Sequence, residues 1–195
     1  MLATDVGFIE MRIAKVVGFG PPLAEEDFQC VVLDEVSGDR HLVIEIGMAE
    51  AFWLAAHLQD VLFGRPMTYQ LTAALVRGLG DQVRQVRIDR LIEGAYYGAT
   101  VEVEGPAGVQ FVDARPSDAL NLGAITNAPI FVSPQVADDA NRRQGEDSPI
   151  ATLLSYALTA PAMRIMREPP AESENEQGDP RDTHPYRGGF GSPSV

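Results

Sequence analysis

The chain has 195 residues, of which 45% are hydrophobic, and it carries a formal net charge of −13. This length is enough for one domain with a true core and too short for two large domains. Proteins that hold nucleic acid through bulk electrostatics are usually basic, so the negative charge excludes that mode of binding. Any contact with nucleic acid has to be local, and it needs a divalent metal, a small arginine cluster, or both.

The single cysteine, Cys30, lies in the apolar run FQCVVL and is predicted to be a small core side chain. One cysteine excludes disulfides within the chain and favours a reducing compartment. The first ten residues, MLATDVGFIE, lack the pattern of a signal peptide, and no apolar segment reaches membrane-spanning length. We therefore expect a cytoplasmic protein with no membrane partner.

The first part of the chain is predicted to form a sheet followed by two helices. Residues 8–19, 27–36 and 40–46 each have a strand-like pattern, with the turn SGD before the third, so an antiparallel sheet is expected. Residues 47–63 are apolar on almost every side, which is typical of a helix packed on more than one face. A second helix is expected over residues 67–79.

The second part repeats this order. Residues 82–93, 95–105 and 108–114 predict three strands of a second antiparallel meander. A helix over 117–126 and a short strand over 128–132 follow, and Ser133 is placed to cap a further helix. Because strands and helices show no regular βαβ alternation, we predict an α+β fold with two small antiparallel sheets and interleaved helices in one compact domain.

The composition changes near the C-terminal end of this pattern. We assign residues 1–140 to the compact domain and residues 141–167 to a short helical extension. Residues 168–195 are acidic, rich in proline and glycine, and without periodicity, so a disordered tail is expected. The tail or the acidic surface could serve a protein partner, although a solvated tail with no partner is the simpler interpretation.

Two Arg-Pro pairs precede predicted helices. The segments GRPMTYQL and ARPSDAL each have arginine, then proline, then a hydroxyl residue, Thr68 or Ser117, able to cap a helix. If the fold brings Arg65 and Arg115 together, their guanidinium groups and the helix N-termini could bind a phosphate. The alternative is structural, because each arginine could pair with a nearby carboxylate, Arg115 with Asp113 or Asp118.

Polar residues also share one edge of the first predicted helix. At 100° per residue, Glu50, Trp53, His57 and Asp60 fall within about a quarter turn of one another. Such an edge is usually solvated, but it can also line a site.

Three carboxylates are candidate ligands for a hard divalent metal such as Mg²⁺ or Mn²⁺. Glu50, Asp113 and Asp118 supply the oxygen ligands that these ions prefer. They come from three segments and form no local metal motif. A Walker loop, a Rossmann glycine pattern and a nucleophile elbow are all missing from the sequence, which disfavours nucleotide-dependent and serine-hydrolase functions.

Over residues 8–140 the chain resembles the bifunctional nuclease domain family, whose members are credited with DNase and RNase activity. The resemblance rests on LVIEIGMAEAFWLA, on GRPMTYQL, and on VDARPSDALNLG followed by APIFVS. It implies a small α+β domain that cleaves nucleic acid, and it favours self-association. The cleft residues that it implies are Glu50, Arg65, Thr68, Arg115, Ser117 and Asp118.

Two segments depart from the family pattern. Tyr69 and Gln70 stand where the family typically has His-Asp, so a possible general base or metal ligand is absent. His57 is a distant candidate to replace it. Phe52 and Trp53 replace smaller residues beside Glu50 and are expected to fill part of the cleft.

Two functions follow as hypotheses. In the first, Asp118 and Glu50 hold Mg²⁺ or Mn²⁺ while Arg65 and Arg115 clamp a DNA or RNA phosphate, so the protein is a metal-assisted nuclease. In the second, the fold is kept without catalysis, and the protein is a binding or regulatory module for a protein partner. Under either hypothesis we expect a homo-oligomer, because exposed strand edges in two small sheets need to be covered.

Overall fold

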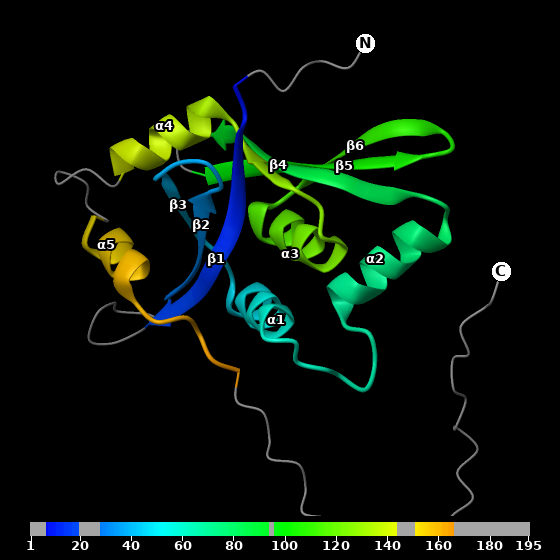
Figure 1. Cartoon of the computed structure of the whole chain (residues 1–195), viewed down its shortest axis with the longest axis horizontal. Helices are drawn as coiled ribbons and strands as arrows, with labels where there is room; N and C mark the ends of the chain where they lie inside the picture. Colours follow the sequence, from blue (N-terminus) through cyan, green and yellow to red (C-terminus); the bar gives the residue numbers. More distant parts are fainter. Residues whose placement is uncertain (1–6, 20–27, 94–95, 144–150, 166–195) are drawn as a thin grey trace, which may run out of the picture. The chain divides into compact units, whose positions relative to one another are not determined.

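The computed structural model describes residues 7–19, 28–93, 96–143 and 151–165, without the side chains of 151–154 (Figure 1). The predicted tail, 168–195, lies outside the described residues. In chain order the elements are β1 (Ile9–Phe19), β2 (Phe28–Glu35), β3 (His41–Glu45), α1 (Met48–Leu58), α2 (Thr68–Gly78), β4 (Gln82–Ile92), β5 (Tyr96–Gly105), β6 (Gly108–Ala114), α3 (Pro116–Thr126), β7 (Ile130–Val132), α4 (Pro134–Arg143) and α5 (Ala151–Thr159).

The strands form one mixed sheet of seven strands in the order β3-β2-β1-β7-β4-β5-β6. The α+β class is therefore confirmed, and both predicted antiparallel meanders are present. The expectation of two separate sheets is wrong, because β7 pairs antiparallel with β1 on one side and parallel with β4 on the other. The three residues of β7 thus form backbone hydrogen bonds with the edge strands of both meanders and join them into one sheet.

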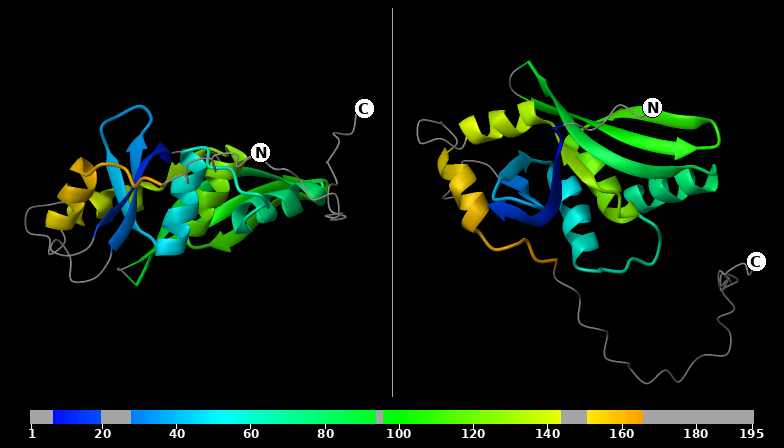
Figure 2. Two further views of the ribbon diagram at one scale, coloured as in Figure 1. Left: turned by 90° about the horizontal axis from the view of Figure 1, so that it is seen from below. Right: turned by 45° about the horizontal axis from the view of Figure 1, so that its top comes forward.

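Helix α3 lies at the centre of the domain, between α1 and α2 on one side and strands β4 and β5 on the other (Figures 1 and 2). Ala119 and Leu120 are fully buried. Gly123 permits the close approach to β4, since a Cβ atom there would lie 3.1 Å from Cγ2 of Val86. The helix ends at Asn127, which has a left-handed φ of 55°. This packing along α3 fixes the position of its N-terminus, where the candidate site lies.

A second, smaller core lies between the sheet and α5. Val17, Cys30 and Val32 of β1 and β2 pack against Ala157 and Ala160, in and just after α5. The prediction that Cys30 is a core residue is confirmed, because it is fully buried and burial raises the pKa of its thiol to about 12. Helix α5 falls within the predicted helical extension, and its packing ties that extension to the domain.

Helix α1 is shorter than the sequence pattern predicts. It ends at Leu58, whereas the apolar pattern continues to Phe63. The cause is Asp60, whose left-handed φ of 52° cannot continue a right-handed helix. Ser133 caps α4 as predicted, accepting a hydrogen bond from the backbone N–H of Val136 at 3.3 Å. In the part of the chain that is described, no helix is both long enough and apolar enough to cross a membrane.

Candidate functional site

The site is built around the start of α3. The helix begins at Pro116, whose fixed φ suits the first helical position, and the residue before a proline favours an extended backbone. Arg115 is therefore the N-cap, with φ −71° and ψ 149°, and the predicted cap, Ser117, lies buried in the first turn. The predicted cap of α3 was thus two residues too late, and that of α2 was one residue too late, because Met67 is the N-cap and Thr68 is the first helical residue.

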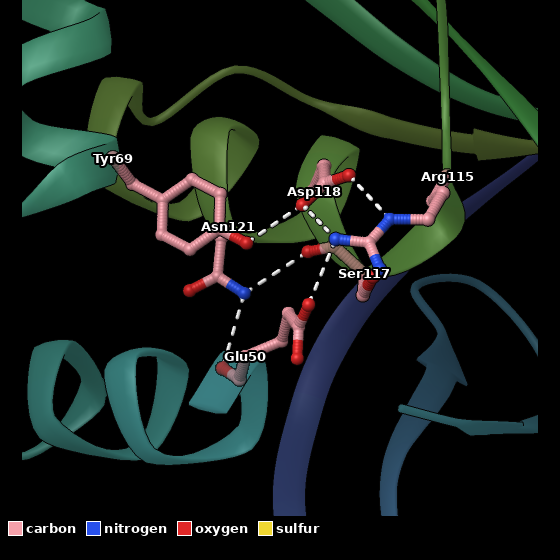
Figure 3. Close-up of polar contacts among 6 residues, drawn as sticks. All are labelled: Glu50, Tyr69, Arg115, Ser117, Asp118 and Asn121. Carbon is pink, nitrogen blue, oxygen red and sulfur yellow. Dashed lines mark hydrogen bonds and ion pairs between the residues drawn. The ribbon is translucent and has the colours of Figure 1, made fainter. Parts of the chain in front are cut away.

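Arg115 bridges two carboxylates from different helices (Figure 3). Its Nε donates to Oδ2 of Asp118 at 2.8 Å and its Nη2 donates to Oδ1 at 3.0 Å, a bidentate pair. The same Nη2 donates to Oε1 of Glu50 on α1 at 2.8 Å. Of the two structural partners open to Arg115, Asp118 is the one it takes, while Asp113 forms an ion pair with Arg90.

Tyr69 of α2 completes the cluster. Its hydroxyl donates to Oδ1 of Asp118 at 2.7 Å, so α1, α2 and α3 all contribute to one hydrogen-bonded group (Figure 3). We call Glu50, Tyr69, Arg115 and Asp118 the Arg115 cluster. Its formal charge is −1, and Asp118 in the first turn of α3 also compensates the partial positive charge of the helix N-terminus.

The pKa values of the cluster reflect these contacts. Burial alone would raise the pKa of Asp118, but the hydrogen bonds from Arg115 and Tyr69 and the charge of Arg115 lower it below 3.8. Burial and the hydrogen bond to Asp118 raise the pKa of Tyr69, and the two carboxylates raise that of Arg115. At neutral pH, Asp118 is therefore a carboxylate and Tyr69 a neutral hydrogen-bond donor.

Asn121 supports the cluster through the backbone of α1 and α3, a role that the sequence did not predict. Its Nδ2 donates to the backbone carbonyls of Glu50 at 3.2 Å and Ser117 at 3.0 Å, which joins α1 to α3 (Figure 3). The side chain is 1% exposed, and within the described part of the chain its Oδ1 accepts no hydrogen bond. The available signal was a polar residue inside the apolar run ALNLG, one helical turn after Ser117.

Arg65 and Thr68 are exposed at the start of α2. Arg65 makes no hydrogen bond or ion pair with any described residue, and the structure does not join it to Arg115. The backbone carbonyl of Thr68 accepts a hydrogen bond from the hydroxyl of Thr72 at 2.8 Å, a contact within α2. The predicted pairing of two arginines on one phosphate therefore remains a prediction.

His57 contacts α3 away from the cluster. Its Nε2 lies 3.1 Å from the carbonyl oxygen of Ala124, toward the end of α3 opposite to Asp118. This nitrogen therefore acts as a hydrogen-bond donor to the backbone. A role for His57 as a general base is not supported by this contact.

An open aromatic pocket of about 270 Å³, counting the solvent space at its mouth, lies between α1 and the start of α2. It shares Tyr69 with the cluster. Trp53 packs edge-to-face on Phe52 and on Phe63, with ring centroids 4.8 and 5.3 Å apart. The lining residues are Trp53, His57, Val61, Phe63, Met67, Tyr69, Gln70 and Ile125. The two segments that depart from the family pattern, Phe52-Trp53 and Tyr69-Gln70, thus meet at this pocket.

The carboxylates of the cluster fit a Mg²⁺-type ion only in part. Among the described residues, no three His, Cys, Asp or Glu side chains gather in one place, so Asp113 does not join Glu50 and Asp118. Mg²⁺, however, is commonly held by one or two carboxylates together with waters and substrate phosphates. A cluster with a charge of −1 and two carboxylates matches that pattern, provided that Arg115 gives up part of its pairing.

Comparison with known proteins identifies the family. The family model described as the bifunctional nuclease domain matches residues 31–144. This chain belongs to the bifunctional nuclease domain family. The matched region contains every residue of the Arg115 cluster and the whole of α3.

The relatives of this family member extend beyond the matched region. An uncharacterized protein of Mycobacterium tuberculosis is 36% identical over 110 residues, which cover 56% of this chain and 65% of that protein. "Bifunctional nuclease 1" of Arabidopsis thaliana is 30% identical over 112 residues, 56% of this chain and 34% of the plant protein. "Bifunctional nuclease" of Oryza minuta is 25% identical over 123 residues, 62% of this chain and 37% of the relative. The matches thus span between about one third and two thirds of these relatives.

Tyr69 and Gln70, the pair that stands where the family typically has His-Asp, have structural roles here. Tyr69 holds Asp118, and Oε1 of Gln70 accepts the backbone N–H of Met67 at 2.9 Å, which satisfies one free donor at the start of α2. With these residues the start of α2 stays ordered, and a phenol stands where the family pattern typically has an imidazole.

Replacing Tyr69 with phenylalanine is expected to lower the free energy of unfolding at pH 7 by about 1 kcal/mol, because Asp118 loses a partly buried donor. The pKa of Asp118 should rise at the same time. A carboxyl group whose pKa is lowered by folding stabilises the fold at pH values above its ordinary pKa of 3.8, and this stabilisation is lost as the pH falls through the pKa of the folded state. The difference in stability between Tyr69→Phe and the wild type should therefore shrink toward pH 3.

Urea unfolding at pH 7 and near pH 3 tests this expectation. Tyr96→Phe is a matched control, because Tyr96 is 71% exposed and its hydroxyl makes no hydrogen bond to the described residues. Equal losses for the two variants at pH 7 would show that the contact between Tyr69 and Asp118 does not stabilise the protein.

Proposed function

We propose that this member of the bifunctional nuclease domain family is a cytoplasmic enzyme that hydrolyses phosphodiester bonds in DNA or RNA with the help of Mg²⁺ or Mn²⁺. One observation carries the proposal. The guanidinium of Arg115, 66% exposed, is held by Glu50 and Asp118 at the N-terminus of α3, within the matched family region. An exposed, oriented guanidinium at a helix N-terminus is suited to bind a phosphate.

In this proposal the protein residues bind and orient the phosphate. Arg115 turns its exposed N–H groups toward the phosphate oxygens, in the fork geometry that matches them. Asp118 stays ionised at neutral pH, and Tyr69 fixes one of its oxygens. Asn121 keeps α1 and α3 in register through the backbone of Glu50. Glu50 and Asp118 would hold the metal ion, which when bound neutralises charge on the phosphate.

Arg65 has a separate role in the proposal. It is exposed just before α2 and has no partner in the described structure, so it is available for a neighbouring phosphate of the same strand. Because the chain has a net charge of −13, such contacts have to act at short range and cannot attract nucleic acid from a distance. We therefore expect weak binding of long duplexes without added metal.

A second function is favoured by the contacts of Asp118. Both of its oxygens accept hydrogen bonds, from Arg115 and from Tyr69, and a tyrosine stands where the family typically has a histidine, a possible general base or metal ligand. A family member with such a closed cluster could have lost catalysis and act as a binding or regulatory module. This second candidate would present its acidic surface or C-terminal tail to a protein partner.

The experiment is cleavage of fluorescent single-stranded DNA and RNA by the purified full-length chain with Mg²⁺, Mn²⁺ or EDTA. The proposal predicts cleavage with at least one metal, none in EDTA, and activity that follows the protein across a final sizing column. Absence of cleavage under all conditions, or activity that separates from the protein, would contradict it. Absence of cleavage together with a specific partner retained from lysate is the result that the second candidate predicts.

A further inference from the structure

Helix α2 presents an apolar face to solvent. Leu71, Leu75 and Leu79 are 51%, 59% and 79% exposed, and Ala74 and Gly78 between them are exposed as well. These positions follow the spacing i, i+3, i+4, i+7, i+8, which in a soluble protein normally marks the face that is covered. Three exposed leucines on one helix indicate an interaction surface.

This face also differs in charge from the rest of the chain. Residues 61–80 contain no aspartate or glutamate and two arginines, Arg65 and Arg77, whereas the whole chain carries −13. Two copies of such an acidic protein repel each other over most of their surfaces. Around α2 this repulsion is reduced, because residues 61–80 bring no negative charge, and the exposed leucines lie on this same stretch.

The order of large and small residues on this face is self-complementary. For two antiparallel helices related by a twofold axis midway between Ala74 and Leu75, Leu71 faces the partner's Gly78, and Leu75 faces the partner's Ala74. Leu71 and Leu75 thus each meet a small residue, which is the condition for close packing of an interface between identical surfaces, while Leu79 faces the partner's Gln70 at the edge of the contact. A different protein partner would not require this internal symmetry.

We infer that a second copy of this chain docks on α2, and that the two α2 helices pair antiparallel through Leu71 and Leu75, with Leu79, the C-cap residue, at the edge of the contact. One helix face is smaller than the roughly 800 Å² per partner of a standard interface, so the dimer should dissociate at about micromolar concentration. Ala73 is the one residue of α2 that is buried within a single copy, so pairing would also help to hold α2, and with it Tyr69, in place. The inference does not depend on nuclease activity.

Sedimentation velocity of the full-length chain from about 1 to 100 μM tests the inference, since this range brackets the expected dissociation constant. The wild type should shift from monomer to dimer. Leu75→Glu places a charge near the twofold axis and should leave a monomer with unchanged circular dichroism. Leu62→Glu is the matched control, because Leu62 is 94% exposed and lies outside α2, and it should still dimerise.

Cross-linking gives a second readout that does not depend on a disruptive substitution. Ala74→Cys places a thiol next to the axis, and the native Cys30 is fully buried with a raised pKa, so it should not react. A short bis-maleimide should give a covalent dimer with Ala74→Cys and very little with Leu62→Cys. A wild type that stays monomeric, a dimer that survives Leu75→Glu, or equal cross-linking of the two cysteine variants would overturn the inference.

Discussion

Replacing Leu120 with alanine is expected to lower the free energy of unfolding by about 3 kcal/mol or more. Leu120 is fully buried in α3, and this helix is enclosed by α1, α2 and the sheet. The elements packed around Leu120 cannot move inward far enough to fill the space left by the missing side-chain atoms. The cost of the remaining cavity therefore adds to the lost transfer free energy of the side chain. A loss of this size is a large part of the 5–15 kcal/mol typical of a whole domain.

Urea unfolding at pH 7 measures the effect. Leu62→Ala is the control, because Leu62 is 94% exposed, and its replacement should change stability by no more than about 0.5 kcal/mol. If Leu120→Ala were as mild as the control, α3 would not be the centre of the core. The start of α3 would then lack the rigid support that the candidate site requires.

Much of the fold could be predicted from the sequence, because its signals are local. Alternating apolar residues located the strands of both meanders, and turn residues separated them. The pairing of β7 was not predictable in this way. Its three residues fit either meander, and only the three-dimensional arrangement brings β1 to one edge and β4 to the other. Nor did the apolar pattern reveal the end of α1, because the left-handed backbone of Asp60 interrupts it without changing hydrophobicity.

The candidate site was predicted in part. The pair between Arg115 and Asp118 was one of the alternatives, since the two residues lie one helical turn apart. The contact between Arg115 and Glu50 joins residues far apart in the sequence, and only the family resemblance placed both in one cleft. Asp113 was grouped with them because of its residue type, but the strand places it against Arg90.

The contacts of Tyr69 and Asn121 could not be predicted from the sequence. Each bonds to a residue on another helix, and each depends on how α1, α2 and α3 pack. Tyr69 was read as the loss of a histidine, whereas its hydroxyl donates the shortest hydrogen bond that Asp118 accepts in the cluster. Residue type alone gives no direction for such a side chain.

The largest functional effect is expected from Asp118→Asn, which should lower phosphodiester cleavage by at least about 100-fold. Asparagine keeps the shape of the side chain and can still accept the hydrogen bond of Tyr69. It removes the negative charge, one of the two proposed metal ligands, and the bidentate partner that orients Arg115. The loss should therefore be in catalysis, with the fold preserved.

The decisive measurement compares metal-dependent cleavage of single-stranded DNA and RNA by the wild type, Asp118→Asn and Asp138→Asn, purified in parallel. Asp138 lies exposed on α4, outside the cluster, so its variant controls for the change of charge and for contaminating nucleases. The account predicts wild-type cleavage for Asp138→Asn and a loss of at least about 100-fold for Asp118→Asn with unchanged circular dichroism. Equal cleavage by all three proteins would contradict it, because the activity would then not reside at the start of α3.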